Sequence, residues 1–144
     1  MGAIVDTTVF IDLERSSPHH EFALSGDLIG KRLTECLGAE EEAAIAAITA
    51  SELLHGVHRA NAEHRARRGA FVESILAVVP VLDFDLLAAR AHARLSAELV
   101  RAGSDVGAHD RIVAATAISL GWRVATANVR HFNRVPGLDV IAVR

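Results

Sequence analysis

The sequence of 144 residues has little cysteine and no long hydrophobic run, and both deficits exclude classes of protein. Cys36 stands alone, so the chain can form neither an internal disulfide nor a cysteine metal cluster. Asp, Glu or Arg interrupts the longest apolar runs well before the ~18 residues that a membrane span requires. The N-terminus lacks the basic-then-apolar pattern of a secretory signal. We therefore expect a cytoplasmic protein that does not enter a membrane.

An excess of positive charge is also absent. The formal net charge of −3 argues against a protein that binds nucleic acid through its overall field. The charge is nevertheless uneven, because residues 58–68 hold four arginines and one acid, Glu63. Such a run is either a solvated helix face or a surface that contacts phosphates, and the sequence leaves both open. The arginines are Arg59, Arg65, Arg67 and Arg68.

The length and the hydrophobic fraction of 51% fit one domain, residues 1–144, with a single core. Strand-like and helix-like segments alternate without a hairpin signal, which predicts an α/β fold with a mostly parallel sheet of about four to five strands between helices. The predicted strands are residues 3–5, 43–48, 78–82, a short run between Gly121 and Thr126, and 138–143. Pro80 marks the third as an edge or irregular strand.

The predicted helices cover residues 7–14, 20–37, 49–77, 85–102 and 110–120. The third is expected to open with a capping box, Thr49-Ala50-Ser51-Glu52, and to continue through the basic segment to about Ala77. The fourth is expected to direct four leucines toward the core and to end in a loop at residues 103–105. These leucines are Leu86, Leu87, Leu95 and Leu99.

The stretch from His109 to Phe132 is the part around which the rest of the chain is expected to be organised. It begins with an acid, Asp110, at the start of a small-residue helix and ends in a polar tip at residues 126–128, after a strand. In an open α/β sheet, ligands bind where strands end and helices begin. Asp6 follows the first strand and Glu52 follows the second, so their carboxylates, Asp110 and the Asn128 amide are expected to converge on one crevice.

Carboxylates that lie within a few ångströms of one another repel, unless a cation neutralises them. The hard cations Mg²⁺ and Mn²⁺ take oxygen ligands and usually keep several waters. A water held in this way is a nucleophile for phosphodiester hydrolysis, and the cation offsets charge that grows on the phosphate oxygens. The converging acids therefore indicate a metal-dependent hydrolase.

Each acid also has a structural explanation. Asp6 suits a helix N-cap, Glu52 suits the return arm of the capping box, and Asp110 suits a first-turn acid that is stabilised by the helix dipole. A phosphatase of the haloacid-dehalogenase type also begins with an Asp at a strand end. Its motif needs a second Asp two residues later, where this chain has Thr8.

Three blocks of sequence resemble the PIN-domain family, and more narrowly the VapC-type toxin ribonucleases of type II toxin–antitoxin modules. They are IVDTTVFIDL at residues 4–13, TASELLHGV at 49–57 and HDRIVAATAISLGWRVATANVRHFNRVPGL at 109–138. The third is the most specific, because the acid, the alanine-rich helix, Gly121, the polar tip and the final HF-x-R-x-PGL occur together. The resemblance, with the spacing of the blocks, covers nearly the whole chain.

The resemblance implies that Asp6, Glu52 and Asp110 are catalytic and bind Mg²⁺, with Mn²⁺ as an alternative. Thr8, Thr126 and Asn128 are implied as supporting residues. Many relatives carry a fourth Asp where this chain has Asn128, and a neutral amide there puts a second metal ion in doubt.

The resemblance further implies an endoribonuclease that cleaves transfer or ribosomal RNA, forms a homodimer and pairs with a VapB-type antitoxin. Arg59, Arg65 and Arg68 are expected to contact the RNA substrate. The alternative within the same fold is an inactive module that binds RNA or protein and has lost its metal site.

Overall fold

The computed structural model describes residues 1–16 and 25–143, and within them the strands form one parallel sheet. Its order is β3-β2-β1-β4-β5, and every pairing of neighbours is parallel. This confirms the predicted parallel α/β sheet and places the first strand at its centre. The strands are β1 (Gly2–Val5), β2 (Glu42–Ala46), β3 (Val81–Leu82), β4 (Arg123–Thr126) and β5 (Val140–Ala142).

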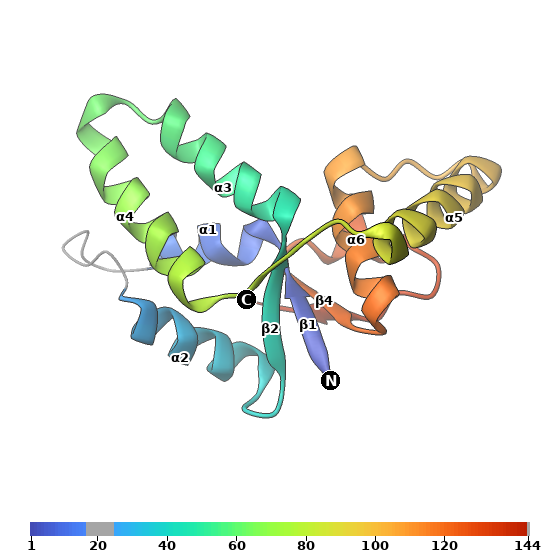
Figure 1. The fold of residues 1–144 in the computed structure, drawn as a ribbon, viewed down its shortest axis with the longest axis horizontal. Helices are drawn as coiled ribbons and strands as arrows, with labels where there is room; N and C mark the ends of the chain where they lie inside the picture. Colours follow the sequence, from blue (N-terminus) through green and yellow to red (C-terminus); the bar gives the residue numbers. More distant parts are fainter. Residues whose placement is uncertain (17–24, 144) are drawn as a thin grey trace.

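Helices cover both faces of the sheet, which makes the fold three-layered (Figure 1). One face carries α1 (Thr7–Ser16), α2 (Gly26–Leu37), α3 (Ala47–Arg59) and α4 (Ala62–Val78). The other carries α5 (Leu86–Ala102) and α6 (Ala108–Leu120), and the short α7 (Val129–Phe132) follows β4. Successive side chains of a strand point to opposite faces, so Ala3 and Val5 enter one hydrophobic cluster while Ile4 enters the other.

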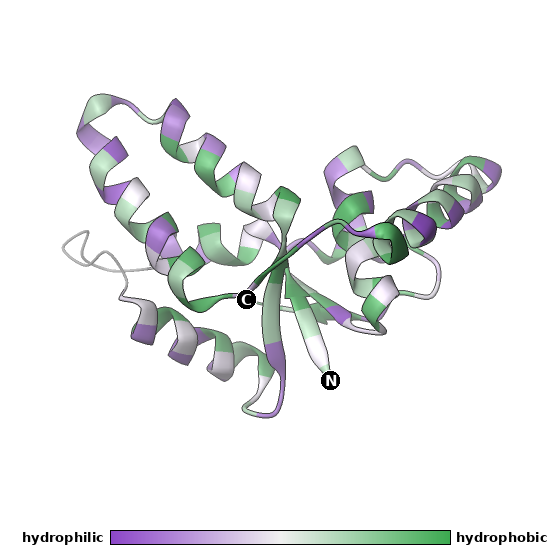
Figure 2. Ribbon diagram, viewed as in Figure 1, coloured by the Kyte–Doolittle hydropathy of each residue, from purple (hydrophilic) through white to green (hydrophobic). Residues whose placement is uncertain are grey.

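The strands are predominantly hydrophobic, and the most hydrophilic positions of α3 and α4 include those at the turn that joins them (Figure 2). Hydrophobic strands are expected in a parallel sheet that is buried on both faces. Within the described residues, no helix has the length and apolar character that crossing a membrane requires. The predicted edge strand is confirmed in shortened form, because β3 follows Pro80 and pairs with β2 at one margin of the sheet.

The capping box predicted at Thr49 to Glu52 is wrong. Helix α3 begins two residues earlier, at Ala47, and Ala46 precedes it without a side-chain capping bond. Thr49 lies inside the helix, fully buried, and its hydroxyl has no hydrogen-bond partner. The tertiary position of α3 on the sheet has therefore overridden a local capping preference. The second strand accordingly ends at Ala46 rather than at the predicted residue 48.

The basic segment was predicted as one continuous helix, but the structure divides it into α3 and α4. The chain is extended at Ala60 and Asn61, and the Asn61 side chain caps α4 by accepting from the backbone N–H of His64 at 3.1 Å. The Arg65 guanidinium donates to the Ala60 carbonyl at 2.9 Å. These bonds satisfy backbone groups that a helix break leaves free, so the two helices form a hairpin (Figure 1).

Helix α5 confirms half of its predicted core positions. Leu95 and Leu99 are buried, but Leu86 and Leu87 are 64% and 63% exposed, so their assignment to the core is wrong. The buried stripe of this helix continues from Leu95 toward its N-terminus through Ala91 and Ala88. Leu87 and Leu86 lie one and two positions before Ala88, respectively, which turns them away from the stripe at 3.6 residues per turn.

The start of the second helix and the presence of a short helix after β4 also differ from the prediction. The second helix, predicted from residue 20, begins at Gly26, with the Ser25 hydroxyl accepting from the backbone N–H of Leu28 at 3.3 Å; residues 20–24 of the prediction lie outside the described part. Helix α7 was not predicted. Its last residue, Phe132, anchors it, because this side chain is fully buried in the hydrophobic cluster that also contains Val113 and Ala117 of α6.

Candidate functional site

Asp6 and Asp110 lie close enough for the charge of one to act on the other, at the edge of the sheet where β1 ends and α6 begins. Asp6 follows β1 and is 6% exposed, while Asp110 lies in the first turn of α6. Partial burial of Asp110, and after it the negative charge of Asp6, raise the pKa of the Asp110 carboxyl. His131 and His109 oppose this rise without cancelling it. The two carboxylates therefore share one electrostatic environment whose negative charge is incompletely compensated.

Two threonine hydroxyls hold the Asp6 carboxylate. Thr8 donates to Asp6 Oδ2 at 2.7 Å, and the fully buried Thr126 donates to the same oxygen at 2.9 Å. Asp6 lies at the end of β1 and Thr126 at the end of β4, so the parallel pairing of these strands brings the groups together. These bonds place Thr8 and Thr126 beside Asp6, and they give its carboxylate side-chain partners other than the backbone N–H groups of a helix start.

Glu52 reaches the same region from α3. Its Oε1 accepts from the Thr7 hydroxyl at 3.2 Å, and its Oε2 lies 3.6 Å from Nδ1 of His109, an ion pair when the imidazole is protonated. Thr7 opens α1 and His109 precedes Asp110, so Glu52 faces the starts of α1 and α6. The proposed return arm of a capping box is excluded, because the box itself does not form.

Asn128 and Asp110 are joined by a residue that sequence analysis did not select. Nδ1 of His131 lies 3.1 Å from Asp110 Oδ2, and Nε2 of the same ring lies 3.1 Å from Nδ2 of Asn128. The available signal was spacing: His131 comes three residues after Asn128, which puts both side chains on one face of a helical turn. That signal was missed because α7 was not predicted.

The oxygen-rich donors suit a hard divalent cation, although they are not yet gathered around one point. Among residues 1–16 and 25–143, no three His, Cys, Asp or Glu side chains are placed to hold a metal ion together. Each predicted acid is instead bonded to neutral or cationic partners: Asp6 to two threonines, Glu52 to Thr7 and His109, and Asp110 to His131. The carboxylate oxygens of Asp6, Glu52 and Asp110 are of the kind that Mg²⁺ or Mn²⁺ takes as ligands.

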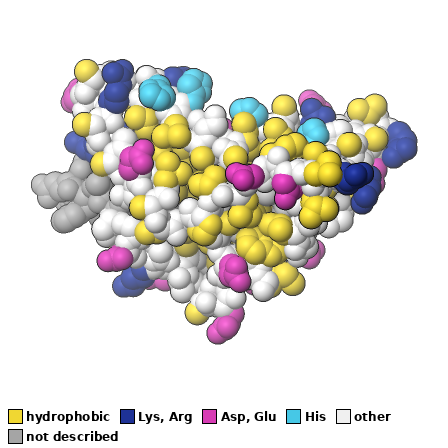
Figure 3. Space-filling view, viewed as in Figure 1, with side chains coloured by type: hydrophobic (Ala, Val, Ile, Leu, Met, Phe, Trp, Pro, Cys, Tyr) yellow, Lys and Arg dark blue, Asp and Glu magenta, His cyan; other side chains and the backbone are white. Residues whose placement is uncertain are grey.

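The predicted RNA-contacting arginines occupy different surroundings. Arg68 lines a pocket of about 240 Å³ together with Thr7 and Glu52, and it pairs with Glu14 at 3.4 Å. Arg65 is bonded to the turn between α3 and α4, and Arg59 lies at the last position of α3. Figure 3 shows Lys or Arg and His side chains gathered over this end of the molecule. Of these three arginines, Arg68 is the one that lines the same pocket as a predicted acid, Glu52.

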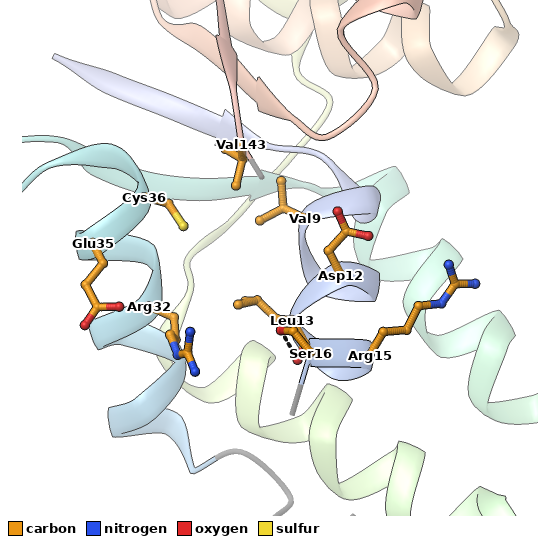
Figure 4. Close-up of a pocket in the computed structure, with 9 residues that line it drawn as sticks. All are labelled: Val9, Asp12, Leu13, Arg15, Ser16, Arg32, Glu35, Cys36 and Val143. Atoms are coloured by element: carbon orange, nitrogen blue, oxygen red, sulfur yellow. Dashed lines mark hydrogen bonds between the residues drawn. The ribbon is translucent and has the colours of Figure 1, made fainter. Parts of the chain in front are cut away.

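A larger pocket, of about 480 Å³, lies between α1 and α2 and contains none of the predicted site residues (Figure 4). Its apolar lining includes Val9, Leu13 and Cys36, and Arg15 and Arg32 are among its charged residues. Cys36 is partly buried there, as a small hydrophobic residue would be. The lone cysteine therefore has no place in the acidic site.

The raised pKa of Asp110 predicts how the stability of the metal-free protein depends on pH. The folded state holds the Asp110 proton more tightly than the unfolded state does, so this carboxyl stabilises the fold at low pH, and that contribution is lost as pH rises through the folded-state pKa. We expect Asp110→Asn to raise the Tm of the metal-free protein at pH 7. The difference in Tm between Asp110→Asn and the parent protein should shrink as the pH falls toward the usual pKa range of an aspartate. Thermal unfolding in EDTA at several pH values measures it, and a Tm lowered at pH 7 contradicts it.

The chain is similar to known proteins along nearly its whole length. The family model of the PIN domain matches residues 3–138. Ribonuclease VapC1 of Rickettsia felis is 35% identical over 99% of this chain and 97% of its own. The tRNA(fMet)-specific endonuclease VapC of Salmonella typhimurium is 38% identical over 67% of this chain and 71% of its own.

The fold is also similar to solved structures. A chain in the crystal structure of DNA-bound VapBC from Salmonella typhimurium superposes with a TM-score of 0.79 and 32% identity, over 97% of this chain and 96% of that one. The family match, the full-length likeness to a VapC ribonuclease and the shared fold lead to one conclusion. This chain belongs to the PIN-domain family, among the VapC ribonucleases.

Proposed function

We propose that this protein is a VapC-type endoribonuclease, the toxin of a toxin–antitoxin pair, which hydrolyses RNA with a divalent cation held by Asp6, Glu52 and Asp110. The observation that carries the proposal is the meeting of Asp6 and Asp110, whose like charges contribute to the raised pKa of Asp110. A bound cation would neutralise part of the negative charge that these carboxylates bring together. The ribonuclease relatives supply the reaction class.

The side chains around the site divide the work. Thr8 and Thr126 fix one oxygen of Asp6, so this ligand is oriented before any cation arrives. Asp110 is partly exposed and would be the second ligand, and Glu52, whose Oε2 lies 3.6 Å from His109, would be the third. Bound Mg²⁺ or Mn²⁺ would act as a Lewis acid that offsets charge growing on the phosphate oxygens.

The phosphatase alternative has no support in this arrangement. Position 8 carries a threonine that donates to Asp6 rather than a second carboxylic acid, and the family match is to the PIN domain. The inactive binding module differs from our proposal because it would bind no metal and would not cleave RNA. Calorimetric titration of the protein with Mg²⁺ and with Mn²⁺ separates the two.

The proposed partners follow from the relatives. The Salmonella typhimurium structure is of VapBC bound to DNA, and we propose a VapB-type antitoxin as the partner of this chain. We retain transfer RNA or ribosomal RNA as the substrate, since one relative is named as specific for tRNA(fMet). A homodimer in the cytoplasm completes the proposal, and the mass of the purified protein in solution tests its oligomeric state.

Cleavage-site mapping on total RNA tests the proposed activity. We expect discrete new 5′ ends when Mg²⁺ or Mn²⁺ is present, and their loss when EDTA is added. The matched control is Asp6→Asn purified in the same way, which removes contaminating nuclease as an explanation. Equal cleavage by this variant and the parent protein, or no cleavage under any metal condition, would refute the proposal.

The basic helix hairpin supplies a prediction about RNA binding. The double substitution Arg65→Ala with Arg68→Ala should weaken RNA binding at low salt and leave metal affinity and the cleavage position unchanged. Each lost phosphate contact should reduce the log–log salt slope by about 0.7 for single-stranded RNA. Binding of a catalytically inactive variant, measured across a salt series, gives the slope.

Single variants separate the two arginines. Because Arg65 is bonded to the Ala60 carbonyl whereas Arg68 lines the pocket with Glu52, most of the effect should follow Arg68→Ala. Arg101→Ala serves as the control, because Arg101 is exposed on α5 and its loss removes the same charge outside the α3–α4 hairpin. An unchanged slope in the double variant would assign the hairpin to a solvated surface or to a protein partner.

A further inference from the structure

Asp6 and Asp110 are connected by a continuous chain of hydrogen bonds that passes through the end of β4 and α7. Thr126 donates its hydroxyl to Asp6 and accepts the backbone N–H of Asn128 at 2.9 Å. The Asn128 side chain then meets His131, and His131 meets Asp110. We call the three side chains of Asn128, His131 and Asp110 the His131 bridge.

The donors and acceptors in the His131 bridge determine where the imidazole proton lies. Nδ2 of Asn128 is the amide nitrogen, which can only donate, so Nε2 of His131 must accept. A neutral ring that accepts at Nε2 carries its proton on Nδ1, the atom 3.1 Å from Asp110 Oδ2. A neutral histidine can therefore donate to the Asp110 carboxylate, and the Asn128 amide, which donates to Nε2, favours the same tautomer as the carboxylate, which accepts from Nδ1.

The backbone around the bridge is well anchored although its side chains reach solvent. Phe132, the next residue, is fully buried in the cluster below α6, and the Asn128 N–H is fixed on the buried Thr126. The His131 side chain itself is 54% exposed. Substituting His131 thus changes the bridge without opening a cavity in the core.

We propose that His131 is a positioning residue that aims the Asp110 carboxylate toward Asp6, and that Asn128 acts by setting the His131 tautomer and not as a fourth metal ligand. The inference rests on the proposed function, because the geometry being positioned is that of the metal site. It gives a physical role to the amide at position 128: a carboxylate there would accept from Nε2 and favour the opposite tautomer, or a doubly protonated ring.

The first test measures the tautomer in the metal-free protein. The ¹⁵N chemical shifts of the His131 ring should show a protonated Nδ1 and an unprotonated Nε2 at a pH where the ring is neutral. Asn128→Ala should shift the ring toward the Nε2–H form. An Nε2–H ring in the parent protein, or a ring unaffected by Asn128→Ala, overturns the inference without bearing on RNA cleavage.

The second test measures metal affinity by calorimetry with Mg²⁺ and Mn²⁺. Loss of a residue that orients a metal ligand typically weakens affinity about 10–100-fold, which is the decrease expected for His131→Ala. His131→Asn places an amide N–H near the position of Nδ1 and should recover part of it. His131→Gln places its amide near Nε2 and should not. His64→Gln, an exposed histidine in the first turn of α4, is the matched control.

The outcomes distinguish this inference from the proposed function. Tight metal binding by the parent protein with unchanged affinity in His131→Ala overturns the inference alone. A parent protein that binds neither cation overturns the metal site of the proposed function, and the positioning role with it. Weaker binding in His131→Ala, with recovery in His131→Asn but not in His131→Gln, supports both.

Discussion

Asp110→Asn is expected to reduce RNA cleavage by about 10²–10³-fold or more, the loss typical when a group that stabilises transition-state charge is removed. The substitution keeps the size and shape of the side chain but removes the negative charge that would hold a cation beside Asp6. It also relieves the electrostatic conflict that contributes to the raised pKa of Asp110, so the fold should persist. Initial cleavage rates at saturating Mg²⁺, together with circular dichroism, measure activity and folding on the same sample.

The same loss is expected for the two other predicted ligands, as Asp6→Asn and Glu52→Gln. Asp83→Asn provides the control, because this aspartate is exposed in the loop before α5. Full activity in Asp110→Asn would remove this residue from the catalytic site. Full activity in Glu52→Gln alone would mean that Glu52 remains bonded to Thr7 and His109 during the reaction, and that the cation is held by Asp6 and Asp110.

Thr126→Val is expected to lower both metal affinity and activity about 10–100-fold, as is typical when the hydrogen-bond partner of a metal ligand is lost. Valine matches threonine in shape, so the change deletes a hydroxyl from a fully buried position. Asp6 loses one of its two donors, and the Asn128 backbone N–H loses its acceptor. Since these partners are partly or fully buried, the free energy of unfolding should also fall by about 1–3 kcal/mol.

The matched control for this prediction is Thr49→Val. Thr49 is equally buried, but its hydroxyl has no hydrogen-bond partner, so its removal should leave stability unchanged or increase it. Urea denaturation compares the two variants, and calorimetry compares their metal affinity. Equal stability losses would show that any polar-to-apolar change at these buried positions has the same cost. Unchanged metal affinity in Thr126→Val would show that Thr8 alone orients Asp6.

The sequence was sufficient to predict five parallel strands that alternate with helices, and the edge of the sheet at which the acids were expected. Buried parallel strands are continuous apolar runs, and by topology alone the residues that follow a strand lie at the same edge of the sheet as those that begin a helix leading into the next strand. Asp6 and Asp110 could therefore be placed together without any knowledge of packing. The residues from Val113 to Ala117 are buried, and their short side chains let α6 lie close to the sheet.

Local patterns failed where packing between distant segments decided the outcome. The capping signal at Thr49 was overridden because α3 starts where β2 ends, and the exposure of Leu86 and Leu87 depends on which stripe of α5 faces α6. The break at Ala60 likewise follows from the return of α4 along α3, although Asn61 offered a cap for the new helix.

The hydrogen bonds of the site depended on tertiary structure most of all. Thr126 and Asp6 are 120 positions apart, and the register of β1 against β4 alone makes the hydroxyl of one a donor to the carboxylate of the other. His131 acquires Asp110 as a partner because α7 packs near the start of α6, whereas its other partner, Asn128, is only three residues away in the chain. A sequence specifies which groups can donate and accept, but hydrogen bonds act over about 3 Å, so only the folded chain selects the pairs.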